Sequence, residues 1–134
     1  GNVTVTGTFV NPSDINLKRN IKPIKGSLQK VLNLQGITFE WKTETELTSL
    51  DLSKGGDRKE SDMRKFNFPE GVQYGVIAQD VEKVLPELVQ TDADGIKSVD
   101  YIKMIPVLIE AIKEQQEEIA RLKLQVETLT QDKR

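Results

Sequence analysis

The sequence predicts an α+β protein: a small mixed globular domain of short strands and helices, followed by a long C-terminal coiled-coil helix. Apolar residues between positions 13 and 103 recur at both strand and helix spacing, whereas residues 104–134 carry a continuous heptad pattern. With 134 residues and 37% hydrophobic content, the chain has material for one modest core. Removing the terminal helix leaves a small body, so we expect partner chains to contribute to its stability.

Residues 3–10 are rich in β-branched and aromatic side chains, which is typical of an extended strand, and Asn11-Pro12 ends this run. We interpret residues 1–12 as the end of an upstream β-rich passenger domain. The alternative is that they form a first strand of the body itself. Because the chain begins with Gly1 rather than methionine, we expect it to be a piece of a longer protein.

The predicted body covers residues 13–103. Apolar residues within 28–32 have the spacing of a short helix, and Gly36 is expected to follow its C-terminus. Next, Ile37, Phe39 and Trp41 alternate with polar residues, so three large apolar side chains share one face of a strand. We assign that face to the core.

Residues 43–71 are dominated by Thr, Glu, Ser, Lys and Asp and predict a long, variable, solvated loop. The elements expected after it are a strand at 74–79, a helix at 80–85 that Pro86 ends, and a hairpin of strands at 88–90 and 96–99. The hairpin turn, Asp92-Ala93-Asp94-Gly95, resembles part of a calcium loop but lacks the remaining oxygen ligands and the distal Glu of such a loop. We therefore expect no metal site there.

From Ile105 onward a heptad frame predicts a coiled-coil stalk over residues 104–134. Its a and d positions, seven of them apolar, form a seam made of Ile105, Leu108, Ile112, Gln115, Ile119, Leu122, Val126 and Leu129. β-Branched residues at a with Leu at d favour two strands, whereas Ile109 and Ala111 beside the seam widen it enough for three. The alternative is an amphipathic helix that folds back on its own body.

Composition excludes several function classes. The chain has no Cys and no His, which removes the usual ligands of zinc, haem and iron–sulfur sites and leaves Lys, Asp or Glu as the available bases. We expect no cofactor. A net charge of −2, from 19 basic and 21 acidic residues, predicts no nucleic-acid binding. No apolar run reaches the roughly 20 residues of a membrane span.

Ser13 and Lys18 lie five residues apart. A serine hydroxyl becomes a strong nucleophile when a base takes its proton, and a neutral lysine amine can be that base where histidine is absent. A lysine in water has a pKa of about 10.4, so burial has to lower its pKa by several units before it can act. A serine and a lysine five residues apart are common on protein surfaces, so their spacing alone does not indicate catalysis.

Several motifs together carry a family resemblance. They are Ser13-Asp14-x-x-Leu17-Lys18-x-Asn20-Ile21, Phe39-x-Trp41, the run from Gly75 to Glu87, Val99-Asp100-Tyr101, and Ile105-Pro106-x-Leu108-Ile109-x-Ala111-Ile112. Over about residues 13–120, the chain resembles the endosialidase-type intramolecular chaperone domain, the S74 peptidase family found on bacteriophage tailspikes, tail fibres and neck appendages and on some bacterial surface proteins.

The resemblance implies a homotrimer that helps three upstream passenger domains of the same polypeptide fold together and is then released by autoproteolysis. It implies that Ser13 is the nucleophile and Lys18 its general base, with positioning roles for Asp14 and Asn20. The implied location is a phage virion tail or appendage, assembled in the host cytoplasm, or a bacterial cell surface. A structural trimerisation anchor that does not cleave is the main alternative, and a receptor-binding tip that uses loop 43–71 is a third.

The sequence is compatible with cleavage on either side of Ser13. The family pattern implies cleavage between Ser13 and Asp14. Within one chain, however, a serine hydroxyl reaches the preceding carbonyl, here that of Pro12, through a five-membered ring, and its own carbonyl only through a strained four-membered ring. Attack by the serine of a neighbouring chain removes this conflict.

Overall fold

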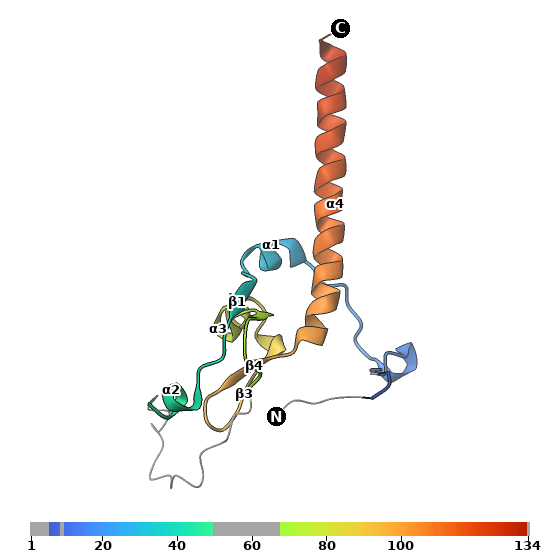
Figure 1. Cartoon of the computed structure of the whole chain (residues 1–134). Helices are drawn as coiled ribbons and strands as arrows, with labels where there is room; N and C mark the ends of the chain where they lie inside the picture. The colour runs from blue at the N-terminus through green and yellow to red at the C-terminus, as the bar shows by residue number, and fades with distance from the viewer. Residues whose placement is uncertain (1–5, 9, 50–67, 134) are drawn as a thin grey trace. The chain divides into compact units, whose positions relative to one another are not determined.

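The computed structural model describes residues 6–8, 10–49 and 68–133 (Figure 1). The elements are η1 (Ile15–Leu17), α1 (Ser27–Leu32), β1 (Ile37–Phe39), α2 (Glu44–Ser49), β2 (Gln73–Gly75), α3 (Ala78–Val84), η3 (Pro86–Leu88), β3 (Val89–Thr91), β4 (Lys97–Val99) and α4 (Tyr101–Asp132). Short strands and helices precede one long terminal helix, which confirms the predicted α+β class. The chain divides into two compact units, Gly1–Ile21 with Ile37–Gly75, and Lys22–Gly36 with Val76–Arg134.

The first unit contains a two-stranded antiparallel ribbon in which Ile37 of β1 pairs with Gly75 of β2. The prediction that Trp41 continues this strand into the core is wrong. The strand ends at Phe39, and Trp41 is 42% exposed and stacks on Phe68 with ring centroids 3.9 Å apart. Ile37 and Phe39 are half-buried, because among the described residues of this unit no second layer covers the apolar face of the two-stranded ribbon.

Two predicted segments fall partly outside the described residues. Of the strand expected over residues 3–10, the described positions 6–8 and 10 are not in a strand. The predicted loop 43–71 contains the helix α2, while its residues 50–67 lie outside the described part of the chain. Helix α2 begins with a reciprocal capping box: Thr43 N–H donates to Glu46 Oε2 at 2.8 Å, and Glu46 N–H donates to Thr43 Oγ1 at 3.3 Å.

The second unit begins with α1, which confirms the helix predicted near residues 28–32. The expected role of Gly36 at its C-terminus is wrong, since the helix ends at Leu32 and its C-cap is Asn33, which has a negative φ of −90°. Such an ending needs no left-handed residue and therefore no glycine. The start of the helix, by contrast, does use a glycine: Gly26 precedes it in a left-handed conformation with φ +66°.

The strand predicted over residues 74–79 ends at Gly75, and α3 already begins at Ala78. Alanine and glutamine favour a helix more than a strand, which explains the early change. Pro86 ends this helix as predicted and opens the short turn η3. The predicted hairpin is confirmed, with Val89 opposite Val99 in the antiparallel register of β3 and β4.

Polar contacts close the hairpin and attach it to α3. In its turn, Asp92 Oδ1 accepts hydrogen bonds from the N–H groups of Asp94 and Ile96 at 2.9 and 3.0 Å. Lys97 Nζ donates to Glu82 Oε1 of α3 at 2.8 Å and to Thr91 Oγ1 at 3.0 Å. The hairpin is therefore held both at its turn and at its side.

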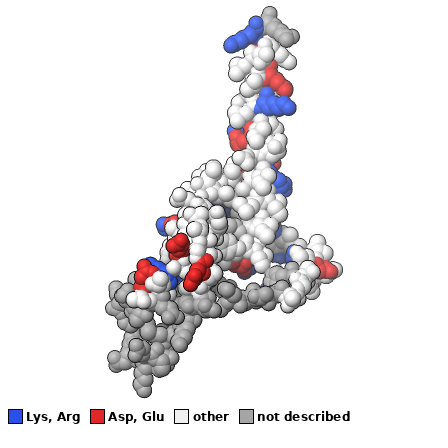
Figure 2. Space-filling model, in the orientation of Figure 1, with Lys and Arg blue, Asp and Glu red and all other residues white. Residues whose placement is uncertain are grey.

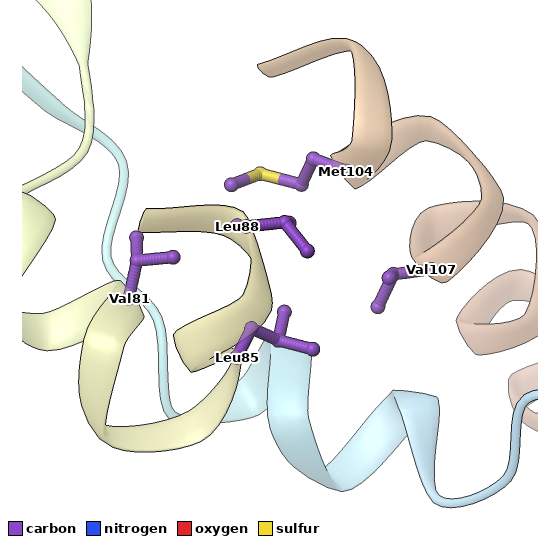
Figure 3. Packing of buried hydrophobic residues seen from close by; sticks show 5 residues of the cluster. All are labelled: Val81, Leu85, Leu88, Met104 and Val107. Atoms are coloured by element: carbon purple, nitrogen blue, oxygen red, sulfur yellow. The ribbon is translucent and has the colours of Figure 1, made fainter. Parts of the chain in front are cut away.

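The core of the second unit lies where α3 and η3 meet the first turns of α4 (Figure 3). Its buried cluster contains Val81, Leu85, Leu88, Met104 and Val107. In Figure 3 these side chains point toward one another from the two sides of the cluster. The N-terminal end of α4 is therefore part of the body.

Truncating a core side chain tests this packing. Leu85 is 4% exposed, so we expect Leu85→Ala to lower the free energy of unfolding by about 2–5 kcal/mol through lost burial and a residual cavity. Denaturant unfolding at a fixed chain concentration measures the change. A loss below about 0.5 kcal/mol, the usual effect of a surface substitution, would contradict the assigned core.

Helix α4 begins at Tyr101, four residues before Ile105, where the heptad frame was expected to start. Asp100 caps it, because its carboxylate accepts a hydrogen bond from Lys103 N–H at 3.2 Å. Pro106 thus lies inside the helix rather than in its first turn, and it removes one N–H that would otherwise donate to the carbonyl of Ile102.

Candidate functional site

The structure brings Ser13 and Lys18 into contact. Lys18 Nζ donates a hydrogen bond to Ser13 Oγ at 2.7 Å. Both residues are exposed in the single chain. The distance lies within the range at which a nucleophile and its general base exchange a proton. We call residues 13–18 the dyad segment.

A short 3-10 turn places this lysine next to the serine. Asp14 caps η1 through its carboxylate, which accepts from the N–H of Asn16 at 2.8 Å and from the amide Nδ2 of Asn16 at 2.9 Å. The turn then closes with hydrogen bonds from Leu17 N–H to Asp14 O and from Lys18 N–H to Ile15 O, both 3.1 Å long. One tight turn reverses the chain, so residues five apart in sequence meet in space.

The two other motif residues also have local roles. Asp14 is the cap of η1, and the positioning role that the resemblance implies for it in cleavage stays a prediction. Asn20 adopts a left-handed conformation with φ +54°, which asparagine tolerates better than most residues. Asn20 therefore sets the direction in which the chain leaves the dyad segment.

The second candidate site is the outer face of α4. Its inner face contributes Met104, Val107 and Ala111 to the buried positions of the second unit. The seam lies on a different face, and all of its eight residues are exposed. The seven apolar members are 41% to 65% exposed, and Figure 2 shows acidic and basic side chains interspersed along this helix. One helix thus carries two apolar stripes, of which its own chain covers one.

Most of α4 stands clear of the rest of its unit. Every residue from Gln115 to Lys133 is exposed. The helix has 32 residues and is about 48 Å long, and an isolated amphipathic helix gains little stability in water without a partner for its apolar face. The exposed seam is therefore a candidate interface for other helices.

A contact that no sequence pattern predicted joins α4 to the start of α1. Glu114 Oε1 accepts from Ser27 N–H at 3.0 Å, and Glu114 Oε2 accepts from Leu28 N–H at 2.8 Å. Gly26 precedes α1 and offers no side-chain cap, so Glu114 satisfies two amide groups that the helix start leaves open. No local pattern reveals partners 86 and 87 residues apart.

Acid is expected to weaken this contact. The N–H groups of Leu28 and then Ser27 lower the pKa of the Glu114 carboxyl below its ordinary 4.5, because they stabilise the charged form. The contact therefore contributes fully above the unfolded pKa and is lost as the pH falls through the lower folded pKa. The amide resonances of Ser27 and Leu28, followed by NMR, should shift below about pH 4.5, whereas resonances unmoved down to about pH 2 would contradict the contact.

Within residues 6–8, 10–49 and 68–133, no acidic residues gather in a group able to hold a metal ion. In the same ranges, no helix combines the length and apolar content needed to cross a membrane.

Comparison with known proteins identifies the family. The family described as chaperone of endosialidase, Peptidase S74, matches residues 13–90. The chain is 30% identical over 116 residues to the long tail fiber protein Gp37 of Enterobacteria phage K3, and equally to that of Enterobacteria phage T2. These alignments cover 84% of this chain but only 8% and 7% of the two relatives. The chain belongs to the chaperone of endosialidase family, Peptidase S74.

Proposed function

We propose that this domain is a homotrimeric intramolecular chaperone of a phage tail fibre or related virion appendage. It templates the folding of an upstream β-structured passenger and is then released by cleavage beside Ser13. The observation that carries the proposal is the exposed seam of α4, which gives three copies a common surface on which to assemble. The family match and the two tail fibre relatives supply the class of passenger.

Assembly along the seam solves a kinetic problem for the passenger. Three β-rich chains that must intertwine meet slowly when each diffuses separately, and exposed strand edges favour aggregation in the meantime. A preformed helical trimer holds the three upstream chains together at high effective concentration. The passenger then folds in an intramolecular search, with its chains already in register.

The hydrogen bond between Lys18 and Ser13 supports a release step. In this step the neutral amine of Lys18 accepts the Ser13 hydroxyl proton while Oγ bonds to the scissile carbonyl carbon. The resulting ammonium returns that proton to the departing nitrogen as the C–N bond breaks, and the peptide becomes an ester on Oγ. Water hydrolyses the ester, which leaves a new carboxyl end and restores the serine hydroxyl.

Release is expected to depend on assembly. In the single chain both members of the pair are exposed to water. A second chain covering the dyad segment would exclude water and favour the neutral amine. Trimer formation would thus switch on cleavage, and loss of the chaperone would make passenger folding irreversible.

We further propose that the serine of one chain attacks the Ser13–Asp14 bond of its neighbour. This arrangement avoids the four-membered ring that attack on a residue's own carbonyl requires. Cleavage within one chain would instead break the Pro12–Ser13 bond. The N-terminus of the released fragment separates the two routes, because it is Asp14 in the first and Ser13 in the second.

The proposal is tested with the chain expressed together with its natural upstream passenger. After refolding at several chain concentrations, time-resolved mass spectrometry reports both the amount and the N-terminus of the released fragment. We expect the initial rate of release to rise with chain concentration. A rate independent of concentration would contradict the coupling of cleavage to assembly.

The second candidate function is a structural trimerisation anchor that does not cleave. The exposure of both Ser13 and Lys18 favours this alternative, because both side chains are open to water in the single chain. In that case the passenger-linked chain would form trimers and remain uncut. The same mass spectrometry experiment, combined with sedimentation, therefore separates the two functions.

A further inference from the structure

The contact between Glu114 and α1 has the properties of an anchor. Helix α1 has six residues and no side-chain cap of its own. Both oxygens of Glu114 hold its first two amides, at 3.0 and 2.8 Å. Ser27 is fully buried, and among the described residues its hydroxyl has no hydrogen-bond partner, so the serine side chain does not replace the carboxylate as a cap. Removing Glu114 would thus leave the start of α1 without side-chain acceptors.

A short stretch of chain connects the anchored helix to the dyad segment. Eight residues, 19–26, separate Lys18 from Ser27. Fully extended, this tether spans at most about 30 Å, which sets the largest distance between Lys18 and the start of α1. Gly26, with φ +66°, turns the tether immediately before the helix and fixes its direction of departure.

The anchor is compatible with assembly along the seam. Counting from Ile112 at position a, Glu114 stands at position c, outside the a and d positions. A trimer formed through the seam would therefore carry three such anchors at the same height on its three helices. Three tethers would then start at one level of the stalk, which keeps the three dyad segments within reach of one another.

We propose that Glu114 is a positioning residue for the release step, anchoring the dyad segment to α4 through α1. This inference rests on the proposed trimer and deepens the proposed cleavage. Glu114 touches neither the serine nor the lysine in this role and acts through the helix that it caps. Its loss is expected to spare trimer formation and to scatter the three dyad segments.

The test uses Glu114→Gln, in which an amide replaces one of the two accepting oxygens. The matched control is Glu110→Gln, one turn earlier on α4, where the carboxylate pairs with Lys113 at 3.0 Å. Because the chain has no cysteine, Arg19→Cys introduces a single spin-label site next to the dyad segment. Distances among the three labels of a trimer are measured by pulsed electron resonance in a Ser13→Ala background, and cleavage is measured separately in unlabelled chains that retain Ser13.

We expect narrow label distances in the parent and in Glu110→Gln, and a clearly broader distribution in Glu114→Gln. In the passenger-linked chain, Glu114→Gln should slow cleavage at least tenfold, with an unchanged sedimentation coefficient. Glu114→Asp, which keeps the charge but is one methylene shorter, should give an intermediate width and rate. Graded label distances and cleavage rates at an unchanged sedimentation coefficient distinguish a positioning role of Glu114 from a general loss of folding.

Equal widths and equal rates in Glu114→Gln and the parent would overturn the inference while leaving the proposed function intact. A parent that forms trimers but is never cut would refute the release step. In that case the label distances still decide whether Glu114 anchors the segment. A monomeric parent would refute both the anchor's role and the proposed trimer.

Discussion

Replacing Lys18 with alanine is expected to abolish release of the passenger without dissociating the trimer. The lysine is the general base in the proposed mechanism, and removing such a base typically lowers a rate by about 10²–10⁴-fold. Its amine lies 2.7 Å from Ser13 Oγ, and both side chains are exposed, so the substitution removes the base without disturbing the core. A denaturing gel of the passenger-linked chain, sampled over time, measures the released fragment.

Two further variants make this prediction sharper. Lys18→Arg keeps a positive hydrogen-bond donor but remains protonated, so it should be as inactive as Lys18→Ala if the lysine is a base. Lys22→Ala, which removes another exposed lysine four residues further on, should cleave at the parental rate. Parental cleavage by Lys18→Ala would show that the contact with Ser13 has no catalytic role.

Placing an aspartate at Ile119 is expected to abolish the trimer. Ile119 occupies position a near the middle of the seam and is 52% exposed in the single chain. Assembly would bury it in every chain, with about 1.5–3 kcal/mol gained for each side chain. The substitution removes that gain and places three unpaired carboxylates in one layer, which is strongly unfavourable. Sedimentation analysis of the variant should therefore find monomers.

The chain offers a matched control for this substitution on the same helix. Leu124 is 64% exposed and also apolar, but it occupies position f, away from the seam. Leu124→Asp makes a comparable chemical change at a comparable exposure and should leave the trimer intact. If both variants dissociated equally, or neither did, the assignment of the seam would be incorrect.

Local patterns predicted much of the fold. Helical spacing near residues 28–32, the stop at Pro86 and the turn composition around Asp92 each act within a few residues, and the structure confirms the corresponding elements. The heptad repeat likewise predicted a long terminal helix. The Thr-x-x-Glu pattern at Thr43 was also readable and would have predicted the start of α2.

Non-local contacts explain most of the errors. Trp41 belongs to an apolar face by alternation, but only the tertiary structure shows that the strand ends at Phe39 and that no second layer formed by the described residues of its unit covers that face. The predicted stalk starts at residue 104, whereas α4 begins at Tyr101 and packs Met104 and Val107 against α3 and η3 of the body. Periodicity identifies the exposed seam, but not a second stripe buried in the same chain.

The same contrast between local patterns and non-local contacts applies to the candidate site. The pairing of Ser13 with Lys18 followed from a motif within a few residues, and the structure adds the capped turn that brings them together. Glu114 could not be found in this way, because its partners at the start of α1 are distant in sequence and contribute backbone N–H groups, which no residue pattern encodes.

Sedimentation equilibrium of the unmodified chain tests the central claim most directly, because templating and release both require three copies to meet along the seam of α4. At micromolar concentration the proposed assembly predicts the mass of three chains, falling to that of one in Ile119→Asp. Monomers alone in the unmodified chain, with the helix beyond Gln115 packed on its own body, would contradict it.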